Sequence, residues 1–216
     1  MISLTHNKIR LALHELRAGD GAPLLLLHGL GEQTPGMAPE VTAAWPGAVY
    51  GLDFTGHGQS TLPVGGGYTA EVMMADADTA LAHLGPCTIL GRGLGGYIAV
   101  LLAGARPTLV RGVIVEDGPG SAGGGPSPTS QNLSTPVHDR AGAPDAFALF
   151  ELSKDIRPPD YAANFARLAV QNSGLDSPIA VAAKFRPEWL EAVVNEIGVM
   201  ECSVRSALEM FAKALR

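Results

Sequence analysis

One stretch, residues 87–105, constrains the fold of this chain more than any other. It begins with a short apolar run, passes through a glycine-rich turn and ends in a second apolar run long enough for a helix. Gly91, Gly93, Gly95 and Gly96 lie in or beside the turn. A buried strand joined so tightly to a helix is typical of a sheet with helices on its faces, so the sequence predicts an α/β fold.

Segments on either side of this stretch alternate between strand and helix patterns. The expected strands cover Ile2–Thr5, Ile9–Leu16, Pro23–Leu27, Ala48–Phe54 and Val110–Val115, and a helix is expected between Thr69 and Gly85. This order predicts a doubly wound, mostly parallel sheet of about six strands. Ligands bind such sheets at the carboxyl ends of the strands, which here carry His28, Asp53, Arg92 and Asp117.

The composition changes after Asp117, and this change suggests how the chain is organised. Residues 1–117 are expected to form the core sheet, 118–142 a loop rich in glycine, proline and serine, and 143–216 a helical, cap-like segment packed on the same domain. Apolar stripes that begin at Tyr161, Trp189 and Val204 are interpreted as core packing; the second stripe includes Ile197. The sheet is then expected to end at the Val110 strand, whose apolar edge a C-terminal helix or a second copy of the chain would cover.

Composition and charge narrow the classes of function. The 216 residues, 46% hydrophobic and 17% charged, suit one globular domain. A net charge of −6 without a basic run argues against a nucleic-acid surface. No apolar run is long enough for a membrane and no signal-peptide pattern is present, so we expect a cytoplasmic protein. We expect no cofactor and no metal; the predicted partners are a small-molecule ligand and, at the sheet edge, a second copy of the chain.

Four motifs in order resemble the α/β-hydrolase superfamily. They are His28-Gly29-Leu30-Gly31, Asp53-x-x-Gly56-His57-Gly58-x-Ser60, the turn around Gly93, and Arg106-Pro107 leading to Val115-Glu116-Asp117. The resemblance covers residues 9–117, about half of the chain. It implies the fold of that family, a nucleophile elbow with Gly93 at its tip, and an oxyanion hole near the amide of Leu30.

The residues that would carry catalysis depart from the family pattern. Gly93 stands in place of the nucleophilic serine of Gly-x-Ser-x-Gly, and without that oxygen no acyl-enzyme forms by the usual route. The two further strands that bear the acid and the base in the family are not recognisable, and no histidine lies in the C-terminal third of the chain. Asp117 is a candidate acid, and His138, the candidate base, is interpreted as a solvated loop histidine.

We expect the turn to shape a ligand pocket. Its predicted lining residues are His28, Gly29, Leu30, Arg92, Leu94 and Asp117, with Arg92 and Asp117 paired across the pocket floor. The amides of Leu30 and Leu94 would favour an anion or a carbonyl oxygen. The favoured hypothesis is a non-catalytic protein that binds a small molecule, and an active ester or acyl hydrolase with a non-standard constellation stays an alternative.

The same glycines permit a dinucleotide-binding hypothesis. Gly91-x-Gly93-x-x-Gly96 matches the fingerprint whose backbone approaches a pyrophosphate. Glu116 follows Gly96 by twenty residues, where an acid would meet a ribose hydroxyl. Because the fingerprint normally follows the first strand of its domain, and at least three strands precede it here, this alternative ranks last.

Overall fold

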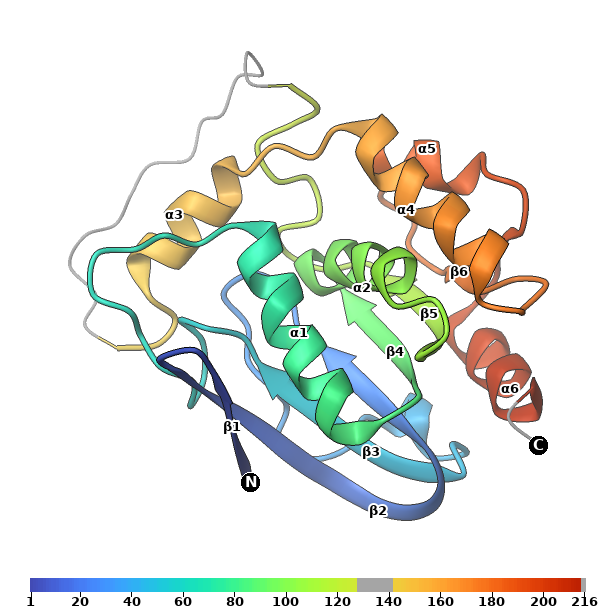
Figure 1. Cartoon of the computed structure of the whole chain (residues 1–216), viewed down its shortest axis with the longest axis horizontal. Helices are drawn as coiled ribbons and strands as arrows, with labels where there is room; N and C mark the ends of the chain where they lie inside the picture. Colours follow the sequence, from blue (N-terminus) through green and yellow to red (C-terminus); the bar gives the residue numbers. More distant parts are fainter. Residues whose placement is uncertain (128–141, 215–216) are drawn as a thin grey trace.

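The computed structural model describes residues 1–127 and 142–214, which contain one seven-stranded sheet with helices on both faces (Figure 1). The elements are β1 (Ile2–His6), β2 (Ile9–Leu27), the 3-10 helix η1 (Glu40–Thr42), β3 (Gly47–Asp53), α1 (Ala70–Leu84), β4 (Cys87–Arg92), α2 (Leu94–Ala105), β5 (Val110–Glu116), α3 (Ala146–Lys154), α4 (Pro159–Asn172), β6 (Ile179–Val181), α5 (Glu188–Val194), β7 (Val199–Glu201) and α6 (Val204–Ala214). The α/β class is confirmed. None of the described helices is both long and apolar enough to cross a membrane.

The long strand β2 shapes the amino-terminal half of the sheet. Its first part pairs antiparallel with β1 and β3, and its last part, Leu24–Leu27, lies between β3 and β4 and runs parallel to β4. The strand therefore wraps around the start of β3. Gly47 makes this wrap possible, because a Cβ atom there would lie 1.9 Å from the carbonyl oxygen of Ala22.

Side chains of the central strands alternate between two cores. Leu25, Leu27 and Ile89 belong to the larger core, which α1, α2, α4 and α5 cover. Leu26 and Leu90 belong to a smaller core on the opposite face, covered by α6 and the region around η1. Helix α2 is buried along almost its whole length because nearly all of its residues are apolar or glycine. The turn that precedes α2 is therefore held rigidly against the sheet.

The C-terminal part of the chain corrects two predictions. Residues 143–216 are not only helical, because β6 and β7 extend the sheet in parallel register beyond β5. The strands predicted to be missing are thus present, although each has only three residues. The edge of β5 is paired with β6, so the exposed edge predicted at the Val110 strand does not exist. A homodimer stays a prediction, but an exposed edge of β5 no longer provides a reason to expect it.

Candidate functional site

Gly93 alone forms the turn between β4 and α2. Its backbone has φ 55° and ψ −116°, a region that a residue with a side chain enters at a cost of about 1–3 kcal/mol. The glycine at position 91 allows the turn to close, since a Cβ atom there would lie 2.3 Å from the carbonyl oxygen of Gly95. The backbone has the strained strand–turn–helix form of a nucleophile elbow, and its tip carries no side chain.

The backbone N–H groups of Leu30 and Leu94 converge on one point, and the carbonyl oxygen of Pro119 occupies it. Each amide donates a hydrogen bond of 3.1 Å to this oxygen. The same oxygen lies over the elbow, because a Cβ atom on Gly93 would be 2.2 Å from it. The chain itself therefore fills both the place of an oxyanion and the place of a side chain at residue 93.

The segment that fills these places, Gly118–Ser121, is referred to below as the plug, and a buried arginine holds it. Arg157 is 1% exposed, donates through Nη1 to the carbonyl oxygens of Gly120 and Ser121, and lies 4.7 Å from the centre of the Tyr97 ring. Burial lowers the pKa of Arg157 to about 10, so it stays charged at neutral pH. The indole N–H of Trp189 also donates to Ser121, at 2.8 Å.

Arg92 and Asp117 do not form the predicted ion pair. The Nε atom of Arg92 lies 3.0 Å from the Glu32 carboxylate, and its Nη1 donates to the backbone carbonyl of Asp117 at 2.8 Å. The Asp117 carboxylate accepts hydrogen bonds from the backbone N–H groups of Lys184 and Phe185, each at 2.9 Å. The prediction is wrong because β6, which sequence patterns did not reveal, brings those two amides to the carboxylate.

His28 and His57 shape the loops around the elbow. His28 accepts a hydrogen bond at Nε2 from the backbone N–H of Phe54 (3.1 Å) and donates from Nδ1 to the carbonyl of Gly29 (2.8 Å). His57 makes the same pair of bonds with two other backbone groups. A ring nitrogen that accepts from an N–H carries no proton, so both rings are neutral. Burial lowers the pKa of both, that of His28 to about 4.

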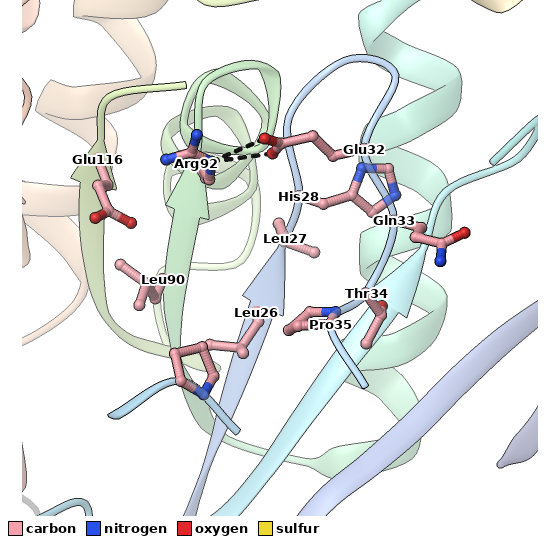
Figure 2. Close-up of a pocket in the computed structure, with 11 residues that line it drawn as sticks. Leu26, Leu27, His28, Glu32, Gln33, Thr34, Pro35, Leu90, Arg92 and Glu116 are labelled. Carbon is pink, nitrogen blue, oxygen red and sulfur yellow. Dashed lines mark hydrogen bonds and ion pairs between the residues drawn. The ribbon is translucent and has the colours of Figure 1, made fainter. Parts of the chain in front are cut away.

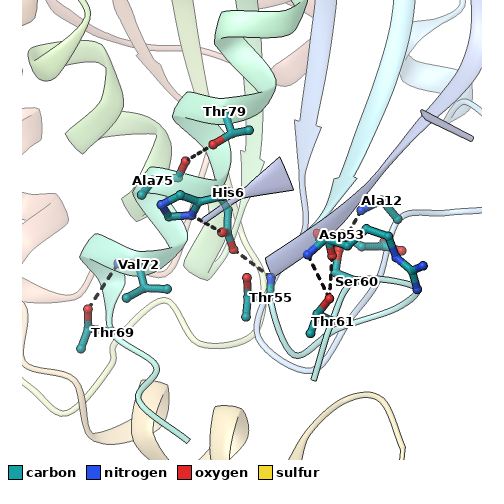
Figure 3. A network of polar contacts seen from close by, with 12 residues as sticks. His6, Ala12, Asp53, Thr55, Ser60, Thr61, Thr69, Val72, Ala75 and Thr79 are labelled. Carbon is teal, nitrogen blue, oxygen red and sulfur yellow. Dashed lines mark hydrogen bonds and ion pairs between the residues drawn. The ribbon is translucent and has the colours of Figure 1, made fainter. Parts of the chain in front are cut away.

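The motif that begins at Asp53 has a structural role as well. This carboxylate is 2% exposed and accepts hydrogen bonds from the amides of Thr34 and Gln59, both 2.8 Å, and from His14 at 2.9 Å. Burial alone would raise the pKa of Asp53, but these hydrogen bonds lower it. The hydroxyl of Ser60 joins β2 to the carbonyl of Asp53 in the neighbouring network (Figure 3). These residues brace the loops that position the elbow.

No residue takes the place of the catalytic base among the parts of the chain that the structure describes. In the family the base follows the last strand of the sheet, and the residues after β7 here are Cys202 and Ser203. His138, the candidate base, lies outside the described residues, and the sequence contains no histidine after it.

One cavity at this end of the sheet lies on the face opposite α2 (Figure 2). This cavity of about 290 Å³, named here the Leu90 cavity, is lined by Leu26, Leu27, His28, Glu32, Gln33, Thr34, Pro35, Pro39, Leu90, Arg92 and Glu116. Its floor is apolar, and its rim carries the Arg92–Glu32 pair and Glu116. Among the residues predicted to line a pocket, His28 and Arg92 do so. The cavity was not foreseen because Leu26 and Leu90 belong to no motif.

Two known proteins are similar to this chain in sequence. Over 124 residues it is 31% identical to an (E)-2-((N-methylformamido)methylene)succinate hydrolase of Acinetobacter baylyi, an alignment that covers 54% of this chain and 44% of that protein. Over 104 residues it is 32% identical to the sn-1-specific diacylglycerol lipase ABHD11 of Danio rerio, covering 46% of this chain and 32% of the lipase. The chain thus spans less than half the length of either relative.

The fold is also that of an N-formylmaleamic acid deformylase from Pseudomonas putida S16, with a TM-score of 0.66 and 17% identity over 100% of this chain and 99% of the deformylase. A likeness at this identity shows the fold alone. The sequence model of the alpha/beta hydrolase family matches residues 24–203, which include β6 and β7. Because that match covers most of the chain and agrees with the strand order, the chain belongs to the alpha/beta hydrolase family.

Proposed function

We propose that this chain is a non-catalytic member of its family that binds a small molecule. The observation that carries the proposal is the pair of hydrogen bonds from Leu30 and Leu94 to the carbonyl oxygen of Pro119. Stabilising an oxyanion requires donors that are free to meet it. Here both donors are already bound, in a position where a nucleophile on residue 93 would meet the same carbonyl group.

Other parts of the site support the loss of catalysis. The elbow lacks a hydroxyl, and the Asp117 carboxylate is bound by two backbone amides. A water molecule could not be activated between the oxyanion amides and Asp117, because the amides already donate to Pro119 and the carboxylate already accepts from two backbone N–H groups. These features arise from separate parts of the chain, so one substitution does not account for them all.

The two alternatives have weaker support. Active hydrolysis is favoured by the names of the relatives, but it would require the plug to leave the elbow and another nucleophile to act. Dinucleotide binding would use the free N–H groups at the start of α2, where Leu94 is bound to Pro119. The glycines of the fingerprint are explained by packing, since a Cβ atom on Gly96 would lie 2.9 Å from a methyl group of Val115.

The Leu90 cavity is the place where we expect the ligand. It lies at the carboxyl ends of β2, β4 and β5, where ligands of parallel sheets bind. Its volume of about 290 Å³ is near the lower end of ligand pockets, and it combines an apolar floor with a few charged groups on the rim.

Hydrolysis of p-nitrophenyl acetate and butyrate tests the non-catalytic part of the proposal. We expect no turnover above the buffer rate from the wild type or from Gly93→Ser, because the added hydroxyl would lack both a base and space. Gly36→Ser is the matched control, since no atom lies within 4 Å of a Cβ atom placed there. Turnover by the wild type that co-purifies with the protein would overturn the proposal, and turnover gained by Gly93→Ser would contradict the expectation that a base and space are lacking.

A further inference from the structure

We infer that the Leu90 cavity accepts a small ligand that has an apolar body and a protonated amine, with the amine facing Glu116. The inference rests on the proposed binding function and specifies the class of ligand. It follows from the size of the cavity, from the side chains of its floor and from the balance of charge at its rim.

The size and floor of the cavity define the apolar body. An enclosed apolar cavity of about 150 Å³ accommodates one benzene molecule. The Leu90 cavity, at about 290 Å³, has room for one ring and a short arm. Leu26 and Leu90 form its floor, and Pro35 and Pro39 contribute to its wall, so a hydrocarbon ring would bury apolar surface there.

The rim carries more negative than positive charge. Of the residues that line the cavity, Glu32 and Glu116 are acidic and Arg92 carries a positive charge; Asp117 does not line the cavity but lies next to Arg92, which donates to its backbone carbonyl. Arg92 is bound to Glu32, and the Asp117 carboxylate is bound to backbone amides. An anionic ligand would therefore enter a region that already has an excess of carboxylates.

Glu116 is the group at this rim that lacks a partner. Within residues 1–127 and 142–214, no hydrogen bond or ion pair reaches its carboxylate, and Figure 2 shows it at the edge of the cavity beside Leu90. Burial raises its pKa, with Arg92 opposing this effect and Asp117 and Glu32 adding to it. A ligand ammonium would form a charge-assisted hydrogen bond with this carboxylate, whereas a neutral ligand would leave it without a countercharge.

Three probes that share a phenyl ring and a short arm separate the charge classes. They are 2-phenylethylamine, 2-phenylethanol and 3-phenylpropanoate, titrated calorimetrically at neutral pH in phosphate buffer that contains no amine. We expect the amine to bind the wild type at least about tenfold more tightly than the alcohol, and the propanoate to bind most weakly.

Glu116→Gln is the decisive variant, because it removes the charge and keeps the shape. The amine should then bind only as tightly as the alcohol, whose affinity should not change. Glu188→Gln, at an exposed glutamate of α5 that does not line the cavity, is the matched control and should retain the preference. Leu90→Trp, checked for folding by circular dichroism, should weaken all three probes by filling the cavity.

Three results would overturn the inference: equal binding of the alcohol or propanoate, a preference that survives in Glu116→Gln, or no binding of the amine at millimolar concentration. None of these results affects the ester assay, which tests the lost catalysis separately. Conversely, ester turnover by the wild type would remove the non-catalytic assignment even if the amine binds.

Discussion

The two faces of the sheet differ at the carboxyl end of β4: one is covered by the plug and the other borders a cavity. On the side of α2, the plug covers Gly93, and two amides and a buried arginine hold it there. On the other side, Leu90 faces a cavity of about 290 Å³ with Glu116 unpaired at its rim. The comparison teaches that residues near one motif can lie on two different surfaces: the chain's own backbone covers the elbow, whereas the cavity floor is formed by Leu26 and Leu90, which belong to none of the four motifs.

Gly93→Ser tests the closed side, with the largest expected effect. The new side chain would adopt a positive φ and meet the carbonyl oxygen of Pro119 at 2.2 Å. We expect a loss of about 4 kcal/mol in the free energy of unfolding, from backbone strain and overpacking together. Urea denaturation measures it, with Gly36→Ser as the control that should match the wild type. Equal free energies of unfolding for Gly93→Ser and Gly36→Ser would mean that the plug moves aside at little cost.

His28 belongs to both sides, since it braces the loop that carries Leu30 and also lines the Leu90 cavity. Burial lowers the pKa of His28 from 6.5 to about 4. Between pH 4 and pH 6.5, His28 is therefore protonated in the unfolded chain and neutral in the folded chain. Its contribution to stability is therefore present above pH 6.5 and is lost as the pH falls toward 4.

The matching experiment compares the wild type with His28→Asn in denaturant titrations at neutral pH and near pH 4. The stability advantage of the wild type should shrink on acidification by roughly 3 kcal/mol, because each pKa unit corresponds to about 1.4 kcal/mol. An advantage that stays constant across this range would show that His28 is not held neutral by burial.

Arg157→Met tests whether the arginine holds the plug. Removing the donor leaves the carbonyl of Gly120 without this partner and leaves that of Ser121 with only the indole N–H of Trp189, so the plug should open more often. We expect hydrogen exchange at the amides of Leu30 and Leu94 to accelerate roughly tenfold, or about 1.4 kcal/mol of local stability. Arg106→Met, at an exposed arginine paired with Asp78, should leave that exchange unchanged. Equal rates of hydrogen exchange at Leu30 and Leu94 in both variants would show that Arg157 does not hold the plug in place.

Glu116→Gln tests the open side, with the smallest expected effect. Because burial raises the pKa of Glu116, its ionised form is disfavoured in the folded state, and the neutral glutamine should stabilise the protein slightly at neutral pH. A gain within about 0.5 kcal/mol, measured by thermal denaturation, is expected. The gain should disappear as the pH falls through the raised pKa and the glutamate becomes protonated. A clear loss of stability would indicate that this carboxylate has a partner.

Much of the sheet was predictable because its signals are local. Apolar runs mark the central strands, and Thr69 caps α1 as expected, its side chain accepting a hydrogen bond from Val72. The three-residue strands β6 and β7 are too short to show an alternating pattern, so they were missed. Ile197, assigned to a core stripe, is 92% exposed because α5 ends at Val194 and the chain turns away.

By itself, the sequence determined the family resemblance, the elbow and the absence of its serine, since these depend on residue type and spacing within short segments. Only the tertiary structure decided that Pro119 closes the elbow, that Asp117 is bound by amides after β6, and that Glu116 faces a cavity. The physical reason is that these facts depend on contacts between backbone groups far apart in the chain. A carbonyl oxygen carries no signature in the sequence, yet here it occupies the site that the motif predicts.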